Sequence, residues 1–190
     1  EIFNTPLVGH YNWDYTDADT RIKKLYELGK ELNWNGSIDL DWSNHLKSGE
    51  APIKAELIAR MEGPLAALPE EERIEYMRHD QAWTLSQFLH GEQGAMLVAS
   101  QLVSCAPTYQ AKLYAASQTF DEARHVEVFA RYLKEVNGIE YPINKNLKAL
   151  IDKILSDERW DLKFIGMQII IEGLALAAFQ TTKETSNCPL

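Results

Sequence analysis

Hydrophobic and polar positions follow a helical repeat along most of the 190-residue chain. Apolar residues recur at spacings of three and four, and no stretch keeps the period of two that is typical of a strand. The pattern predicts helical segments at 18–33, 52–63, 70–104, 108–136, 145–155 and 158–183. Three of these segments are long enough to pack side by side, so we expect an all-α fold with a helical bundle core.

Residues at the ends of these segments support the boundaries. Thr16 or Asp17 can cap the first helix, and Asp157 can cap the last. Asn137-Gly138 is a favourable C-cap pair for the helix that precedes it. Residues 1–16 lack a steady period and predict an extended arm, whereas 33–49 is a loop whose Trp34 and Trp42 are expected to dock on the core.

Composition and charge narrow the function classes. Hydrophobic residues make up 45% and charged residues 25%, which is typical of a globular chain. The net charge of -9 argues against binding to nucleic acid or to an anionic membrane, since both need a basic face. The chain holds two cysteines, Cys105 and Cys188, and no apolar run near the roughly 20 residues of a membrane span. We therefore expect a cytoplasmic protein without disulfides.

Three glutamates lie inside apolar helical stripes. Glu92 has Phe88 and Leu89 before it on its face, and Met96 and Ala99 after it. Glu122 and Glu172 lie in equivalent stripes, and His125 follows Glu122 by one helical turn. An unpaired carboxylate in such a place is costly, and a bound dication removes that cost. Buried salt bridges are the alternative interpretation.

Helix register brings two of these glutamates to the same height. Glu92 lies 13 residues before Cys105, and Glu122 lies 12 residues after Gln110. At about 1.5 Å per residue, both are roughly 18–20 Å from the turn at Pro107. An antiparallel hairpin would therefore place Glu92 beside Glu122 and His125.

Glu-x-x-His on one helix and a lone Glu on its neighbour form half of the di-iron carboxylate pattern. Glu172 is the candidate for the lone Glu of the other half, but the chain has no second Glu-x-x-His. We expect that motif on a fourth core helix beyond Leu190, so that this chain alone carries only part of the ligand set.

Three segments resemble a known family, the ferritin-like di-iron oxygenases, and especially the hydroxylase subunits of bacterial multicomponent monooxygenases and their relatives. The segments are Gly91-Glu92-Gln93-Gly94-Ala95, Ala115-Ala116-Ser117-Gln118-Thr119-Phe120-Asp121-Glu122-Ala123-Arg124-His125 and Ile165-Gly166-Met167-Gln168-Ile169-Ile170-Ile171-Glu172-Gly173. The resemblance implies a four-helix di-iron core that activates O2 to hydroxylate, N-oxygenate or desaturate a small organic substrate. An electron-donor protein and assembly as a homo-oligomer are the partners expected with it.

The resemblance also implies roles for individual residues. Glu92, Glu122 and His125 would bind one iron, with Glu122 bridging to a second iron that Glu172 serves. Asp121 and Arg124 would orient a metal-bound imidazole, although a surface ion pair is the plainer alternative. Gln93, Gln118 and Gln168 are candidate hydrogen-bond donors near the ligands, whereas His79 and His90 are out of phase with Glu92.

A substrate pocket beside the metals would be lined by Ala95, Met96, Ala99, Phe129, Leu176 and Phe179, which are equally the residues of a plain bundle core. Gly91 and Gly94 would let another group approach the helix closely. Two other classes of function remain open: iron storage or peroxide detoxification by a ferritin-like protein, and a metal-free helical interaction module.

Overall fold

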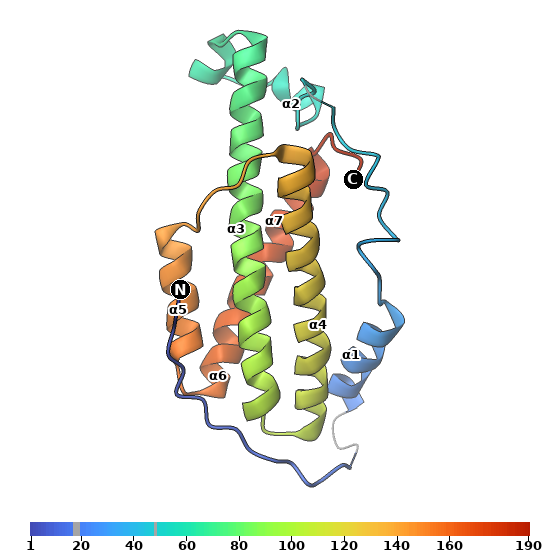
Figure 1. The fold of residues 1–190 in the computed structure, drawn as a ribbon, viewed down its shortest axis with the longest axis vertical. Helices are drawn as coiled ribbons and strands as arrows, with labels where there is room; N and C mark the ends of the chain where they lie inside the picture. The colour runs from blue at the N-terminus through green and yellow to red at the C-terminus, as the bar shows by residue number, and fades with distance from the viewer. Residues whose placement is uncertain (17–19, 48) are drawn as a thin grey trace.

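Helices joined by loops make up the computed structural model, which describes residues 1–16, 20–47 and 49–190 (Figure 1). The elements are α1 (Thr20–Glu31), α2 (Ala55–Ile58), the 3₁₀-helix η1 (Pro64–Ala67), α3 (Glu70–Cys105), α4 (Tyr109–Tyr132), the π-helix η2 (Leu133–Asn137), α5 (Lys145–Ser156), α6 (Trp160–Lys163), the π-helix η3 (Phe164–Ile171) and α7 (Glu172–Thr185). No strand occurs within the described ranges, which confirms the all-α class. A ferritin-like four-helix core stays a prediction.

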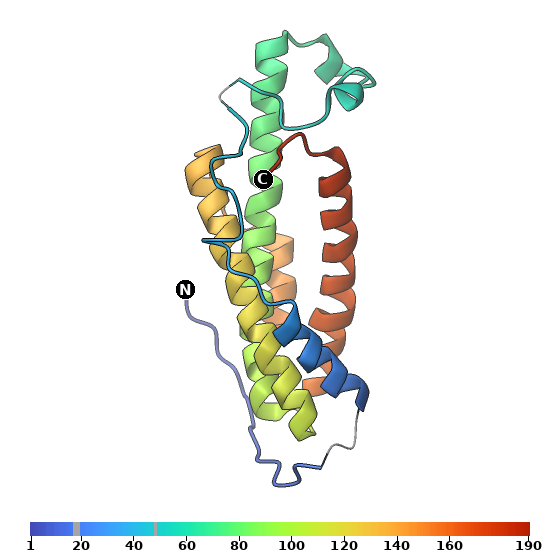
Figure 2. The same cartoon turned by 90° about the vertical axis from the view of Figure 1, so that its right-hand side faces the viewer.

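The centre of the molecule is the antiparallel hairpin of α3 and α4 (Figure 1). Thr108 caps α4, because its hydroxyl oxygen accepts a hydrogen bond of 3.2 Å from the Ala111 amide. At the other end, Gly138 has a φ of 68° and donates its amide to the Leu133 carbonyl at 2.8 Å. The predicted C-cap is therefore confirmed, although the last turn is a π-helix. In Figure 2, α1 lies across the lower half of α4.

The third long helical segment is predicted as one α-helix over 158–183, and the structure differs from this prediction. It consists of α6, η3 and α7, so a π-helical stretch immediately precedes Glu172. Such stretches are uncommon in helices and recur at functional sites.

The predicted Asp157 cap is wrong: its carboxylate accepts the Arg159 amide at 2.9 Å, and the helix begins at Trp160. Of the two predicted caps for α1, Asp17 lies outside the described residues, and Thr16 donates its amide to Asp14.

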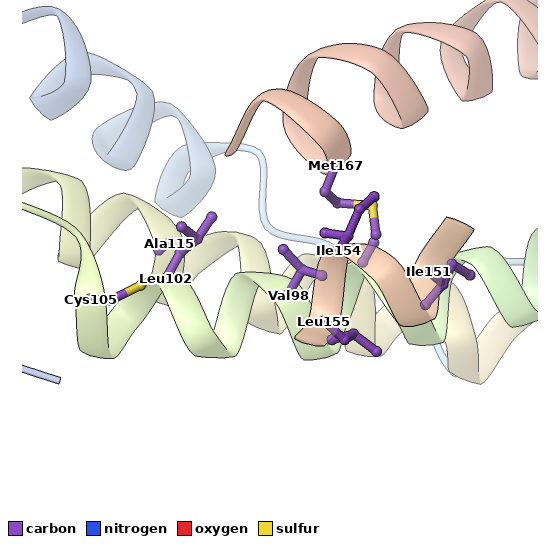
Figure 3. Packing of buried hydrophobic residues seen from close by; sticks show 9 residues of the cluster. Val98, Leu102, Cys105, Ala115, Ile151, Ile154, Leu155 and Met167 are labelled. Atoms are coloured by element: carbon purple, nitrogen blue, oxygen red, sulfur yellow. The ribbon is translucent and has the colours of Figure 1, made fainter. Parts of the chain in front are cut away.

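One core cluster joins α3, α5 and η3 around Val98, Leu102, Ile154 and Met167 (Figure 3). Two glycines permit this close packing. A Cβ atom at Gly94 would lie 2.9 Å from two carbons of Ile151, and one at Gly166 would lie 3.0 Å from Ile154. The predicted close approach is therefore confirmed at Gly94. At Gly91 nothing in the described residues lies within 4 Å of that position, so a close approach there stays a prediction.

We expect Gly94→Ala to destabilise the protein by about 1–3 kcal/mol, because the new methyl group must displace α5. Gly91→Ala is the matched control on the same helix. With open space around it, that change should be neutral or stabilising by up to about 1 kcal/mol, since alanine favours the helix. Urea unfolding of both variants measures the difference, and equal stabilities would contradict this packing.

The outer face of the third helical segment is apolar and exposed. Ile165, Ile169, Ile170, Leu174 and Leu176 are between 44% and 68% exposed. By length and composition, Trp160–Thr185 is a helix able to cross a membrane, with a mean hydropathy of 1.7 and 11% of the most apolar window buried. The sequence-based statement that no apolar segment approaches the length of a membrane span is therefore wrong. One such helix is weak evidence, since the core helix of a soluble protein passes the same test.

Candidate metal centre

The side chains of Glu92, Glu122 and His125 converge between α3 and α4. His125 Nδ1 lies 3.2 Å from Glu92 Oε2 and 3.0 Å from Glu122 Oε2. One ligand atom from each residue lies within 4.8 Å of the others. Both carboxylates are buried, at 5% and 4% exposed. The predicted convergence is thus observed, because each residue has the right helical phase and the hairpin sets the height.

One further side chain fixes this arrangement from within α4. Gln118 lies one turn before Glu122 and donates its amide to Glu122 Oε1 at 3.2 Å. This hydrogen bond leaves Oε2 of Glu122 directed at His125. The other two glutamines differ: Gln93 is exposed, and the amide nitrogen of Gln168 is buried without a hydrogen-bond partner among the described residues.

The loop after α1 covers the imidazole. Trp34 stacks on His125 with 6.2 Å between the ring centres. Arg124 holds the loop in place by donating to Asn33 Oδ1 at 2.6 Å and to the Trp34 carbonyl at 2.7 Å. It also pairs with Asp121 and lies over the Trp34 ring. Asp121 and Arg124 therefore pair as expected, and Arg124 also anchors the loop. Their role in orienting a metal-bound imidazole stays a prediction.

Mutual proximity shifts the acidities of the three groups. Burial raises the pKa of Glu92 to about 7, with the neighbouring Glu122 adding to the rise. Burial also acts to raise the pKa of Glu122, but hydrogen bonds from His125 and Gln118 hold it below its usual range. Burial opposes the charge on His125, yet the two carboxylates raise its pKa to about 10. The cluster therefore keeps a proton where a metal cation can replace it.

Glu172 lies near this cluster but outside the group of three. Burial, followed by the charges of Glu122 and Glu92, raises its pKa to about 7. Tyr114 belongs to the same neighbourhood, since burial and the charges of Glu122 and Glu172 raise its pKa. Glu172 is thus close enough to feel the other carboxylates, and its ligand role stays a prediction.

We expect Glu172→Gln to stabilise the metal-free protein at pH 8 by roughly 1–3 kcal/mol. The pKa of Glu172 is raised from 4.5 to about 7 in the folded state. Its protonated side chain therefore stabilises the fold fully below about pH 4.5, and this stabilisation is lost as the pH rises through 7. At pH 4.5 the variant should match the wild type in urea unfolding. Glu184→Gln, an exposed change on α7, is the control. A Glu172→Gln variant less stable at pH 8 would contradict this account.

The predicted pocket residues separate into two groups. Phe129 and Phe179 line one cavity of about 410 Å³. Ala95 and Ala99 are fully packed in the core, Met96 is half-buried, and none of the three lines that cavity. Leu176 is 68% exposed, so its predicted place in the pocket is wrong. On the same helix, Ala175, Phe179 and Thr182 are half-buried.

His79 and His90 point away from the centre, as their phase predicts. His79 Nδ1 lies 2.6 Å from the Tyr141 hydroxyl, and His90 Nε2 lies 2.9 Å from the Tyr141 carbonyl. Sequence reasoning missed the contact of Trp34 with His125 and the closeness of Tyr114 to the carboxylates of Glu122 and Glu172. Trp34 reaches His125 from a distant loop, so no local spacing reports the contact, whereas Tyr114 precedes Glu122 by eight residues and shares its helix face.

No protein-family model, no curated protein and no solved structure matches the chain. The chemistry of the donor set must therefore carry the functional argument. Two carboxylates and one imidazole suit a divalent first-row metal, and no thiolate takes part. The residues present fit one metal ion.

Proposed function

We propose that this protein is a non-haem iron oxidoreductase whose centre is a carboxylate-bridged di-iron site that activates O2. The observation that carries the proposal is the convergence of Glu92, Glu122 and His125 in a buried position between two long helices. The resemblance of the segments around these residues to di-iron oxygenases supports iron as the metal. This chain supplies three ligands to one iron, with Glu172 available toward a second.

Bound iron would transfer electrons to O2 and supply the Lewis acidity for its reduction. Hydroxylation of a C–H bond consumes O2, two electrons and two protons, and it releases one water molecule. The electrons would come from a donor protein. The chain itself contributes two buried carboxylates, with Trp34 stacked on His125 and Gln118 fixing the carboxylate of Glu122.

The protein residues also manage protons at the centre. His125 holds a proton between the two carboxylates and must release it for Nδ1 to bind a metal. Glu92 and Glu172, with pKa values of about 7, can each take up or release a proton near neutral pH. These groups lie where O2 reduction would require protons.

Ferrous loading of the metal-free chain without oxygen, followed by exposure to O2, tests the proposal. We expect saturation at one iron per chain, because the residues present supply ligands for one metal ion, and oxygen uptake faster than by free iron in the same buffer. An iron-storage protein would instead accumulate many irons per chain over repeated additions. A chain that binds no iron, or that leaves the rate of oxygen uptake unchanged, would refute the proposed function.

A further inference from the structure

A cavity of about 410 Å³ lies between α3, α4, α7 and the loop after α1. Its walls consist mainly of carbon, contributed by Trp42, Leu85, Phe88, Val128, Phe129 and Phe179. Small-molecule sites are commonly apolar hollows of this size with a few polar groups at fixed places.

The cavity lies one to two helical turns from the candidate ligands, none of which lines it. Phe88 lies one helical turn before Glu92, Phe129 lies one turn after His125, and Phe179 lies two turns after Glu172. The three phenylalanines are therefore displaced from the candidate ligands toward the same end of the bundle, because α3 runs opposite to α4 and α7 (Figure 1). The rings contact one another, with 4.9 Å between the centres of Phe88 and Phe179 and 5.9 Å between those of Phe129 and Phe179. They form the wall of the cavity nearest the carboxylates.

The polar groups of the cavity come from α3, α4, α7 and the residues after α7, and they include the Tyr132 hydroxyl and the Cys188 thiol. Thr182, Ser186 and Gln81 are uncharged, and Lys183 is the one charged residue among the described residues that line the cavity. Lys183 forms no ion pair with any residue in the part of the chain that the structure describes. Its neighbour Glu184 accepts a hydrogen bond from Gln180 at 2.5 Å instead. An exposed lysine that forms no ion pair within the described residues thus lies at the edge of an apolar hollow.

We propose that this cavity binds a small organic anion, with its carboxylate at Lys183 and its apolar body against the phenyl rings. The absence of acidic side chains among the described lining residues disfavours a cation, and the apolar walls disfavour a sugar or a nucleotide. As a substrate assignment this rests on the proposed function, in which iron held one to two helical turns away would oxidise the bound molecule. Binding itself needs no metal.

Calorimetry with three probes of one shape tests the inference on the metal-free full chain. The probes are 4-phenylbutyrate, 4-phenylbutan-1-ol and 4-phenylbutylamine, which share an apolar body and differ in charge. We expect the carboxylate to bind about tenfold more tightly than the alcohol, and the amine to bind most weakly. Lys183→Met should reduce carboxylate affinity to that of the alcohol and leave alcohol binding unchanged, whereas Lys183→Arg should restore most of it.

Lys145→Met, which removes an exposed lysine on α5 far from the cavity lining, is the matched control and should change neither affinity. Equal binding of the carboxylate and the alcohol, or an unchanged carboxylate affinity in Lys183→Met, would overturn the inference. A chain that binds 4-phenylbutyrate at Lys183 but no iron would refute the proposed function alone. A chain that binds iron but no 4-phenylbutyrate would refute the cavity assignment alone.

Discussion

Replacing Glu122 or His125 by alanine should abolish tight iron binding. Each change removes one of three ligand atoms that now lie within 4.8 Å of one another. Loss of groups that merely support a ligand already costs roughly 10–100-fold in affinity, so loss of the ligand itself should cost more. Elemental analysis after ferrous loading and desalting measures the retained metal.

Glu127→Ala is the control for these variants, because Glu127 is an exposed carboxylate on the same helix. It should retain wild-type iron, and helical circular dichroism should show that all variants are folded. Glu122→Gln adds a variant of equal size that removes the charge only. Wild-type iron content in Glu122→Ala or His125→Ala would show that these residues are a structural ion-pair cluster.

Iron affinity should fall at least a hundredfold between pH 8 and pH 6. The pKa of His125 is raised to about 10, so over this whole range one proton must leave before Nδ1 can bind a metal. That competition alone costs about tenfold per pH unit. Glu92 and Glu172, with pKa values of about 7, add to the loss on the acid side.

Anaerobic titration calorimetry in two buffers of different ionisation heat measures this linkage. At pH 7, ferrous binding should release more than one proton per iron, and the Glu172→Gln variant should release fewer if Glu172 is a ligand. Binding that releases no protons and does not change with pH would mean that the metal sits away from His125.

The candidate centre could be predicted from the sequence because its determinants are local. The helical phase of Glu92 and of Glu122 follows from neighbours within two turns, and their height follows from the distance to Pro107. The residues that complete the surroundings come from distant segments. The position of Trp34 depends on a hydrogen bond from Arg124 to the Trp34 carbonyl. The two residues are 90 positions apart in the sequence, so no periodicity reveals this contact.

The third helical segment shows where periodicity fails. A run of apolar residues such as Ile169-Ile170-Ile171 has the same composition in an α-helix and in a π-helix, so the pattern could not predict η3. The burial of individual side chains on α7 is also set by tertiary packing. Leu176 and Phe179 are both in phase with Glu172, yet Leu176 is 68% exposed whereas Phe179 packs against the rings of Phe88 and Phe129.

Anomalous diffraction at the iron edge, from crystals of the ferrous-loaded chain, tests the central claim most directly. We predict a single strong peak between the carboxylates of Glu92 and Glu122 and the Nδ1 atom of His125, with any second peak lying on the side of Glu172. Crystals of fully loaded protein without iron between these three side chains would contradict the account.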